Sequence, residues 1–370
     1  MAKIKVLHIF ENYSHVYQPY IPPVIEGLKQ DEDLDISIVA YKGRSSKALK
    51  VVPKYLKRRL VERWYQFINK RYKNLSYIEI WALKNKTDII HVQQSYMFPR
   101  ILGLTEITKG IRPKLVVTLR GSETYVKPWV QDKWETFFKD YGNNIDAFVV
   151  MSTHQKEYLQ RWGVEQDRIH VIPISFGQKF EAKPKKASKD GIKIVSVFRL
   201  CWEKNINGNL MVIKILKEQG FKVSYDVFGD GPELGKLYYL INKYHLNDSV
   251  KVHGRVDNHE LKKKLGNYDF ILQLSHSEAF PTSVLEAQAI GIPAIVSNAG
   301  GLPDAIQQNN SGYAMDANDT ERAADYIAGL WKDVEKYYSF SKAGIDYAQY
   351  HFSVDNEVSA IKSLYIHLTK

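Results

Sequence analysis

Short runs rich in valine, isoleucine and leucine alternate with helix-length amphipathic stretches along most of the chain. This alternation is typical of parallel β-sheets that are wrapped by helices. In the first half it predicts strands at Ile4–Phe10, Leu34–Ala40, Ile89–Val92, Lys114–Leu119, Ala147–Val150 and Ile169–Ile172. In the second half it predicts strands at Ile192–Phe198, Lys222–Phe228, Val250–His253, Asp269–Leu274, Ala294–Ser297 and Gly312–Ala314.

A polar stretch, Gln178–Gly191, separates the two series of strands and predicts a linker, because it contains few apolar residues. Two consecutive units of similar size indicate an α/β protein with two Rossmann-like domains that face each other across a cleft. In such sheets ligands bind outside the carboxyl ends of the strands. The loops that follow the predicted strands are therefore where chemistry is expected.

Length and composition fit this picture. The 370 residues exceed one typical domain of about 150 residues and suit two. Apolar residues make up 44% of the chain and charged residues 25%, which excludes wholesale disorder and a protein with many membrane spans. No apolar run approaches the roughly 18 residues needed to cross a bilayer, and the first ten residues lack the apolar stretch of a signal peptide. A single cysteine, Cys201, excludes an internal disulfide, so we expect a cytoplasmic protein.

The positive charge is concentrated in one short segment. Residues 42–73 contain seven lysines, five arginines and one glutamate, which accounts for the whole net charge of +11. A protein that binds nucleic acid usually spreads its basic residues over a whole groove, so a local surface patch is the better interpretation, and we expect no nucleic-acid partner.

Within this segment an amphipathic helix is predicted over Pro53–Tyr72. Apolar residues recur there at helical spacing, at Leu56, Leu60, Trp64, Phe67, Ile68 and Tyr72. Basic residues surround them, at Lys54, Lys57, Arg58, Arg59, Arg63, Lys70 and Arg71. Two interpretations stay open: the helix lies on an anionic membrane, or its apolar stripe packs on its own domain and its basic face is solvated.

The densest chemical signal follows the strand that ends at Leu274. A polar loop carries Glu278, Pro281 is predicted as the first residue of a helix, and Thr282 and Ser283 occupy its first turn. Such a helix start with hydroxyl residues suits a phosphate group. Glu278 and Glu286 flank it, and ionised carboxylates can grip the vicinal hydroxyls of a sugar or a ribose. A purely structural interpretation is a capping Glu278 and a solvated Glu286.

The order of these residues, with Gly291-Ile-Pro293 after them, resembles the fingerprint of glycosyltransferase family 4. This family contains retaining enzymes with the GT-B fold that use nucleotide sugars. The resemblance covers the second half almost continuously and the first half loosely. It includes Val195–Lys204, Phe228–Glu233, Val252–Val256, Gly300–Asp304 and Phe352–Asp355.

The resemblance assigns the domains and the donor site. It implies an acceptor-binding domain over residues 1–178, completed by a C-terminal helix at 353–370, and a donor-binding domain over 190–350. Arg199 and Lys204 would hold the diphosphate, and two cations can indeed neutralise a leaving group that gains negative charge. Glu278 would orient the sugar and Glu286 the ribose. The nucleotide pocket would be bordered by Gly229, Gly231, Gly254, Arg255 and Val256.

The first half is expected to bind the acceptor. Polar loops follow three of its predicted strands and contain Asn12, His91 and the run Arg120-Gly-Ser122-Glu123. Arg120 stands where the family often has a histidine that touches the transferred sugar, and it is therefore a candidate catalytic residue. His91 fits a buried, hydrogen-bonded histidine equally well. Two departures from the family pattern are Phe198 and Asn205, which both replace a usual glycine.

The expected reaction moves a hexose-type sugar from a nucleotide diphosphate sugar to a hydroxyl of a saccharide or lipid-linked saccharide, in cell-surface polysaccharide or glycolipid biosynthesis. We expect no metal, pyridoxal phosphate or nicotinamide cofactor. The enzyme would be cytoplasmic, or peripheral on the inner face of the plasma membrane. The alternatives are a nucleotide-sugar 2-epimerase of the same fold and a basic module that binds polyanions or membranes without catalysis.

Overall fold

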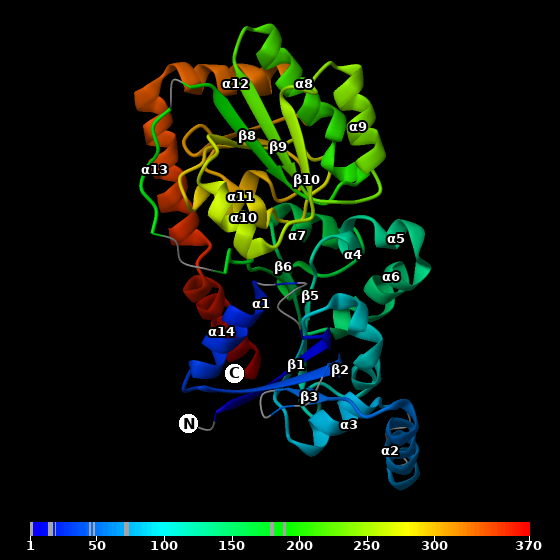
Figure 1. Cartoon of the computed structure of the whole chain (residues 1–370). Coiled ribbons are helices and arrows are strands. Elements are labelled where there is room, and N and C mark those ends of the chain that lie inside the picture. The colour runs from blue at the N-terminus through cyan, green and yellow to red at the C-terminus, as the bar shows by residue number, and fades with distance from the viewer. Residues whose placement is uncertain are drawn as a thin grey trace. The chain divides into compact units, whose positions relative to one another are not determined.

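The computed structural model describes residues 3–13, 18, 20–43, 46, 49–69, 74–177, 181–187 and 190–370. The chain forms two compact units, each with its own hydrophobic core. The first unit contains Met1–Pro173 and Val354–Lys370, and the second contains Ile174–Ser353 (Figure 1). The described parts of the stretch predicted as a linker, 181–187 and 190–191, belong to the second unit, where Lys185 donates a backbone hydrogen bond to Ser341 Oγ at 2.7 Å.

The first unit is built on a seven-stranded parallel sheet in the order β3-β2-β1-β4-β5-β6-β7. The strand order reverses between β1 and β4, which is where sheets of this kind place ligands. The strands are β1 (Ile4–Asn12), β2 (Leu34–Lys42), β3 (Lys50–Val51), β4 (Ile89–Val92), β5 (Lys114–Thr118), β6 (Ala147–Val150) and β7 (Ile169–Val171).

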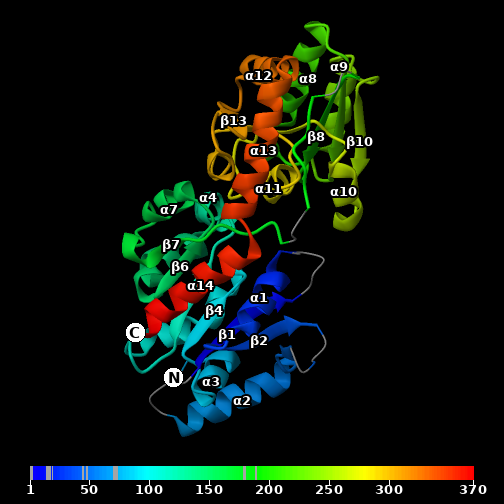
Figure 2. The same cartoon turned by 90° about the vertical axis from the view of Figure 1, so that its left-hand side faces the viewer.

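Helices cover this sheet, and the end of the chain supplies one of them. The helices are α1 (Ile21–Gln30), α2 (Tyr55–Ile68), α3 (Tyr77–Lys84), α4 (Ser122–Tyr125), α5 (Lys127–Val130), α6 (Asp132–Thr136), α7 (Thr153–Gln160) and α14 (Val354–Thr369). Figure 2 shows α14 alongside α1. Lys362 of α14 holds the carboxylates of Asp31 and Asp33 at 2.8 and 2.7 Å, which ties the C-terminal helix to the loop between α1 and β2.

The second unit contains a six-stranded parallel sheet in the order β10-β9-β8-β11-β12-β13. Its strands are β8 (Ile192–Val197), β9 (Val223–Phe228), β10 (Val250–Gly254), β11 (Phe270–Gln273), β12 (Ala294–Ser297) and β13 (Gly312–Met315). Its helices are α8 (Ile206–Glu218), α9 (Leu234–Lys243), α10 (Asn258–Leu265), α11 (Thr282–Gln288), α12 (Thr320–Lys332) and α13 (Val334–His351).

The predicted fold class, α/β with two Rossmann-like domains, is confirmed. Every strand predicted from the sequence is present, with ends that differ by two residues or fewer. Among the strands of the described residues, only the short edge strand β3 was not predicted, because Lys50–Val51 lies in a basic segment without an apolar run.

Candidate functional site

The loop after β8 carries Lys204 and ends in an unusual backbone conformation. Asn205 is left-handed, with φ 45° and ψ 57°, a conformation that glycine and asparagine tolerate better than other residues. Its side chain caps α8 by accepting from the Gly208 N–H at 3.0 Å and donates to the Ala317 carbonyl at 2.8 Å. Asparagine can therefore replace the family's usual glycine here without loss of the loop geometry.

Lys204 and Glu278, which lie 74 residues apart in the sequence, form an ion pair in the second unit. Their side chains are 14% and 15% exposed. The two loops that carry them are also joined through the backbone, where the His276 N–H donates to the Glu203 carbonyl at 2.7 Å. Because β8 and β11 are neighbouring parallel strands, their following loops meet at one edge of the sheet.

A buried amide, Gln273 at the end of β11, connects this ion pair to helix α11. Its Nε2 donates to Glu278 Oε2 at 2.6 Å, and its Oε1 accepts from Ser283 Oγ at 3.3 Å. A second buried amide belongs to Asn209. Its Oδ1 accepts from the Leu274 N–H, directly after β11, and its Nδ2 donates to the Lys204 carbonyl at 2.9 Å. The sequence analysis missed both amides; the available signal was a polar residue inside an otherwise apolar strand or helix face.

Helix α11 begins at Thr282, and Pro281 is its N-cap in an extended conformation. The prediction that Pro281 is the first helical residue was therefore wrong by one position. The first intrahelical bond is donated by the Val284 N–H, which reaches the Pro281 carbonyl at 3.1 Å. The backbone N–H groups of Thr282 and Ser283 precede it, so the helix itself does not use them, and they lie at the positive end of the helix.

Two glycines after β9 lie in close contact with the backbone of the loop that carries Lys204. Gly229 has φ +140°, and a Cβ there would lie 1.8 Å from the Phe198 carbonyl oxygen. A Cβ on Gly231 would lie 2.2 Å from the Leu200 carbonyl oxygen. Gly254, at the end of β10, accepts from the Gly229 N–H at 2.8 Å and has φ +67°. Close backbone packing therefore requires glycine at 229 and 231, whereas at 254, where a Cβ would meet nothing within 4 Å, the positive φ favours it.

Another glycine, Gly300, supports the loop that carries Glu278. Gly300 has φ +58°, and a Cβ there would lie 1.8 Å from the Glu278 carbonyl oxygen. The next residue, Gly301, donates its N–H to that oxygen at 2.9 Å. The Gly300-Gly301 turn therefore fixes the backbone at Glu278.

Glu286 has a partner that the sequence did not reveal. It is buried on α11, and its carboxylate lies 3.3 Å from Nζ of Lys262 on α10. Burial raises the pKa of Glu286, and the nearby Lys262 ammonium opposes that shift. In contrast, Arg199 and Arg255 are exposed and Val256 is half-buried.

In the first unit, Arg120 follows β5 and lies in a hydrogen-bonded loop. Its guanidinium donates to Gln93 Oε1 at 3.0 Å and to the Gln93 carbonyl at 3.2 Å, and it lies 5.3 Å from the Tyr20 ring centre. Glu123 is buried, where it accepts from the Arg120 N–H and from Ser95 Oγ at 2.9 Å. Its carboxylate therefore shapes the Arg120 loop.

The structure shows His91 as a buried, hydrogen-bonded histidine, which is the second of the two interpretations of this residue. It is fully buried, with Nε2 at 2.7 Å from Thr118 Oγ1 and Nδ1 at 2.5 Å from the Tyr365 hydroxyl. Burial lowers its pKa well below the usual range, so the ring is neutral. Ser122 is exposed and Asn12 half-buried, so both are more accessible to an acceptor than His91.

The predicted basic patch is largely on the surface, with one correction. Lys54, Lys57, Arg59, Arg63 and Trp64 are exposed. Arg58 does not belong to the exposed patch, because its side chain is only 16% exposed and its Nε lies 3.9 Å from Glu62. Two more of the predicted residues, Lys70 and Arg71, lie outside the described residues.

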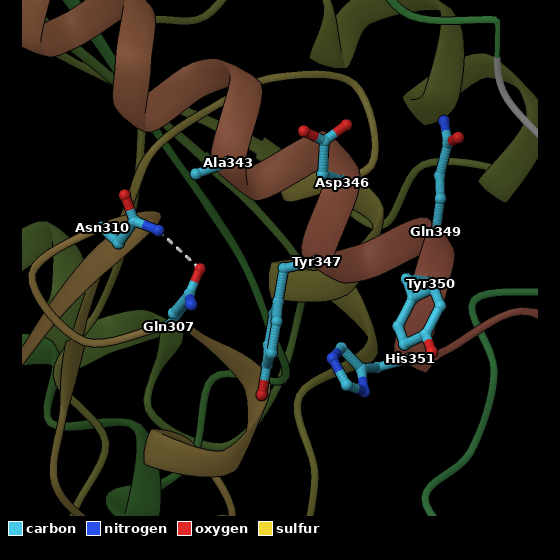
Figure 3. Close-up of a pocket in the computed structure, with 8 residues that line it drawn as sticks. All are labelled: Gln307, Asn310, Ala343, Asp346, Tyr347, Gln349, Tyr350 and His351. Carbon is cyan, nitrogen blue, oxygen red and sulfur yellow. Dashed lines mark hydrogen bonds between the residues drawn. The ribbon is translucent and has the colours of Figure 1, made fainter.

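A separate hollow of about 660 Å³ lies on the second unit between α13 and the loop before β13. Figure 3 shows Tyr347, Tyr350 and His351 of α13 on one side and the hydrogen-bonded pair Gln307 and Asn310 on the other. None of the site residues predicted from the sequence lines this hollow.

The described part of the chain lacks two features. Across the described ranges, no group of three or more His, Cys, Asp or Glu side chains is placed to hold a metal ion. Among the helices formed by these residues, none combines the length and apolar character needed to cross a membrane.

The sequence matches two family models. Residues 178–347 match "Glycosyl transferases group 1" and residues 24–174 match "Glycosyltransferase Family 4". Among curated proteins, N-acetyl-alpha-D-glucosaminyl L-malate synthase from Bacillus anthracis is 33% identical over 77% of this chain and 76% of its own length. The amylovoran biosynthesis glycosyltransferase AmsK from Erwinia amylovora is 27% identical over 66% of this chain and 61% of its own length.

A third relative aligns over a shorter part. The phosphatidylinositol N-acetylglucosaminyltransferase gpi3 subunit from Schizosaccharomyces pombe is 30% identical over 50% of this chain, and the chain spans only 40% of its length. The aligned relatives are transferases or synthases and do not favour the epimerase.

Solved structures share the fold. A glycosyltransferase from Rickettsia africae superposes with a TM-score of 0.76 at 17% identity, covering 100% of this chain and 99% of that one. HepE from Anabaena, solved in complex with UDP-glucose, superposes with a TM-score of 0.72 at 14% identity, covering 97% and 99% of the two chains. These likenesses confirm the predicted GT-B fold class.

Proposed function

This chain belongs to glycosyltransferase family 4, and from that premise we propose that it transfers a sugar from a nucleotide diphosphate sugar to a hydroxyl group of a saccharide or lipid-linked saccharide. The observation that carries the proposal is the Lys204–Glu278 ion pair beside the start of α11. It places a cation suited to a diphosphate next to a carboxylate suited to a sugar hydroxyl.

The donor's diphosphate would lie against Lys204 and the first turn of α11. Lys204 and the exposed Arg199 supply positive charge, and the N–H groups of Thr282 and Ser283 supply hydrogen-bond donors. The leaving nucleoside diphosphate gains negative charge in the transition state, so these groups stabilise it more than they stabilise the bound donor.

Two carboxylates would hold the polyol parts of the donor. Glu278 would accept hydrogen bonds from the sugar, in an orientation set by Gln273 and by the Gly300 turn. Glu286 would accept from the ribose hydroxyls, and Lys262 favours the ionised form that this requires. Gly229, Gly231 and Gly254 would border the nucleotide through their backbone.

The finer features of the reaction are part of the same proposal. We infer a hexose-type donor and transfer with retention, in which the leaving phosphate takes the acceptor's proton on the same face of the sugar and no protein nucleophile is needed. Arg120 would contact the sugar or its phosphate from the acceptor-binding unit. The reaction would need no metal, and a chelator should leave the rate unchanged; a loss that added magnesium or manganese restores would contradict this.

Two of the relatives support the acceptor class. AmsK is named for the biosynthesis of a polysaccharide, and the gpi3 subunit is named for transfer to a phospholipid. We therefore propose a role in cell-surface polysaccharide or glycolipid biosynthesis, in the cytoplasm at the inner face of the plasma membrane.

Nucleotide binding tests the donor site without knowledge of the acceptor. Thermal unfolding should be measured with UDP, GDP and ADP, because a ligand at about 100 times its dissociation constant stabilises a protein by ~2.7 kcal/mol. One of the three should raise the midpoint, and the shift should fall by about half or more in Arg199→Ala and Lys204→Ala but persist in full in Lys336→Ala, an exposed cation of α13. A full shift in both site variants would refute the diphosphate assignment.

A further inference from the structure

Helix α2 presents a stripe of large apolar side chains to solvent. These side chains recur every three or four residues, and their exposed fractions are 77% for Leu56, 67% for Leu60, 57% for Trp64, 82% for Phe67 and 50% for Ile68. Soluble monomers seldom expose a contiguous apolar patch of this kind unless it is an interaction site.

The opposite face of α2 is fixed to the first unit, so the stripe cannot turn inward. Tyr65 is buried on that face, and Glu62 accepts from the Tyr77 N–H at 3.0 Å at the start of α3. At the edge of the stripe, Nζ of Lys84 on α3 lies 5.2 Å from the centre of the Trp64 ring, which is still 57% exposed. Figure 1 shows α2 beside α3 at the outer edge of this unit. The interpretation that the described part of the stripe packs on its own domain was therefore wrong.

Positive charge borders the apolar stripe. Lys54, Lys57, Arg59 and Arg63 are exposed on α2, and Glu62, its one acidic residue, faces the unit. The surrounding segment carries the entire excess charge of the chain. A second copy of the chain would bring the same positive charge against this face of α2, so the two copies would repel each other. A partner surface that is anionic on the outside and apolar beneath complements both the cations and the apolar stripe.

We propose that α2 docks on the surface of a bilayer containing anionic lipids. Its apolar stripe would lie at the boundary between headgroups and acyl chains, and its four exposed cations would contact lipid phosphates. This inference deepens the membrane location in the proposed function, but its test is separate, because vesicle binding is measured without donor or acceptor.

Sedimentation of the full chain with vesicles tests the proposal. Phosphatidylcholine vesicles containing phosphatidylglycerol should bind the protein at low salt, and high salt or pure phosphatidylcholine should weaken binding strongly. Leu60→Ser with Phe67→Ser should weaken it about tenfold or more by removing apolar contacts. Arg59→Gln with Arg63→Gln should weaken it by a similar factor at low salt and by less at high salt.

Matched controls separate this face from general surface effects. Tyr238→Ser with Tyr239→Ser removes apolar side chains that are 55% and 64% exposed on α9, and Lys332→Gln with Lys342→Gln removes two exposed cations of the second unit. Both control variants should bind vesicles like the wild type. The altered positions are exposed, so all variants should keep the wild-type unfolding midpoint.

Three results would overturn the proposal. The first is no binding to phosphatidylglycerol vesicles at low salt, and the second is unchanged binding by the Leu60→Ser, Phe67→Ser variant. The third is a concentration-dependent dimer in the wild type that this variant abolishes while vesicle binding is unaffected, which would assign the face to a second copy.

Discussion

Replacing Lys204 by methionine should separate the stability of the donor site from its chemistry. The substitution keeps the length of the side chain and removes its charge, which leaves the Glu278 carboxylate paired only with Gln273 at 2.6 Å. Truncating one partner of a fully buried pair costs about 3–5 kcal/mol, and exposed pairs contribute about 0–1 kcal/mol. Because both side chains here are 14–15% exposed, we expect a loss of about 2 kcal/mol.

For a unit of this size, about 2 kcal/mol lowers the unfolding midpoint by roughly 4–8 °C. Nucleotide affinity should fall by about 10- to 100-fold, since a charge-assisted hydrogen bond contributes about 1.5–3 kcal/mol. Glu278→Gln should behave differently: it keeps Lys204, so nucleotide binding persists while sugar transfer is lost. In the Lys204→Met, Glu278→Gln double variant the stability loss should be smaller than the sum of the two single losses.

Calorimetric titration with the stabilising nucleotide and thermal unfolding of the four proteins measure these effects. Lys236→Met is the matched control, because Lys236 pairs with Glu233 at 2.7 Å but is 51% exposed, and it should lose less than about 1 kcal/mol. Wild-type midpoint together with wild-type nucleotide affinity in Lys204→Met would refute the role given to this ion pair, as would single losses of stability that simply add.

Three further outcomes follow from the geometry. Gln273→Leu should lower kcat about tenfold and leave nucleotide affinity nearly unchanged, because it removes the amide that orients Glu278 but no charge; steady-state kinetics with an unchanged kcat would contradict this. Gly300→Ala should destabilise the protein by roughly 2 kcal/mol or more, since φ is +58° and the new Cβ would overlap the Glu278 carbonyl; denaturant unfolding measures the loss, and a wild-type value would count against the contact. Burial raises the pKa of Glu79 to about 7, so the folded state binds this proton more tightly than the unfolded state, and the unfolding free energy should fall as pH rises from about 4.5 to 7. Glu79→Gln should lose that part of the pH dependence, and an identical profile in both proteins would show that Glu79 does not titrate in this range.

Strand positions followed from the sequence because a strand in a parallel sheet is buried on both faces. The run Ala147–Val150 is apolar throughout, Ile89–Val92 is apolar except for His91, and the structure buries every residue in both. Neighbouring parallel strands end at one edge of the sheet, so the loops carrying Lys204 and Glu278 could be expected to meet.

Side-chain partners were harder to predict. Lys262 lies on a helix with three successive lysines, and only the packing of α10 decides that Lys262 is the one that reaches Glu286. In the sequence nothing distinguishes Arg58 from the other basic residues of α2. In the structure its side chain lies beside Glu62 and is mostly buried, because its position on the helix is turned toward the first unit. Such choices depend on how helices pack on a sheet, and residue spacing alone does not contain that information.

The identity of the products tests most directly the central claim, which is that this protein transfers a sugar from a nucleotide sugar with retention of configuration. The protein should be incubated with the nucleotide sugar whose nucleotide stabilises it, labelled at the anomeric carbon, together with the saccharide and lipid-linked fractions of cells. We predict that a nucleoside diphosphate is released, that the label appears in a glycoside with the donor's anomeric configuration, and that Glu278→Gln abolishes both. A glycoside with the opposite configuration, or conversion of the donor sugar without any acceptor, would contradict it.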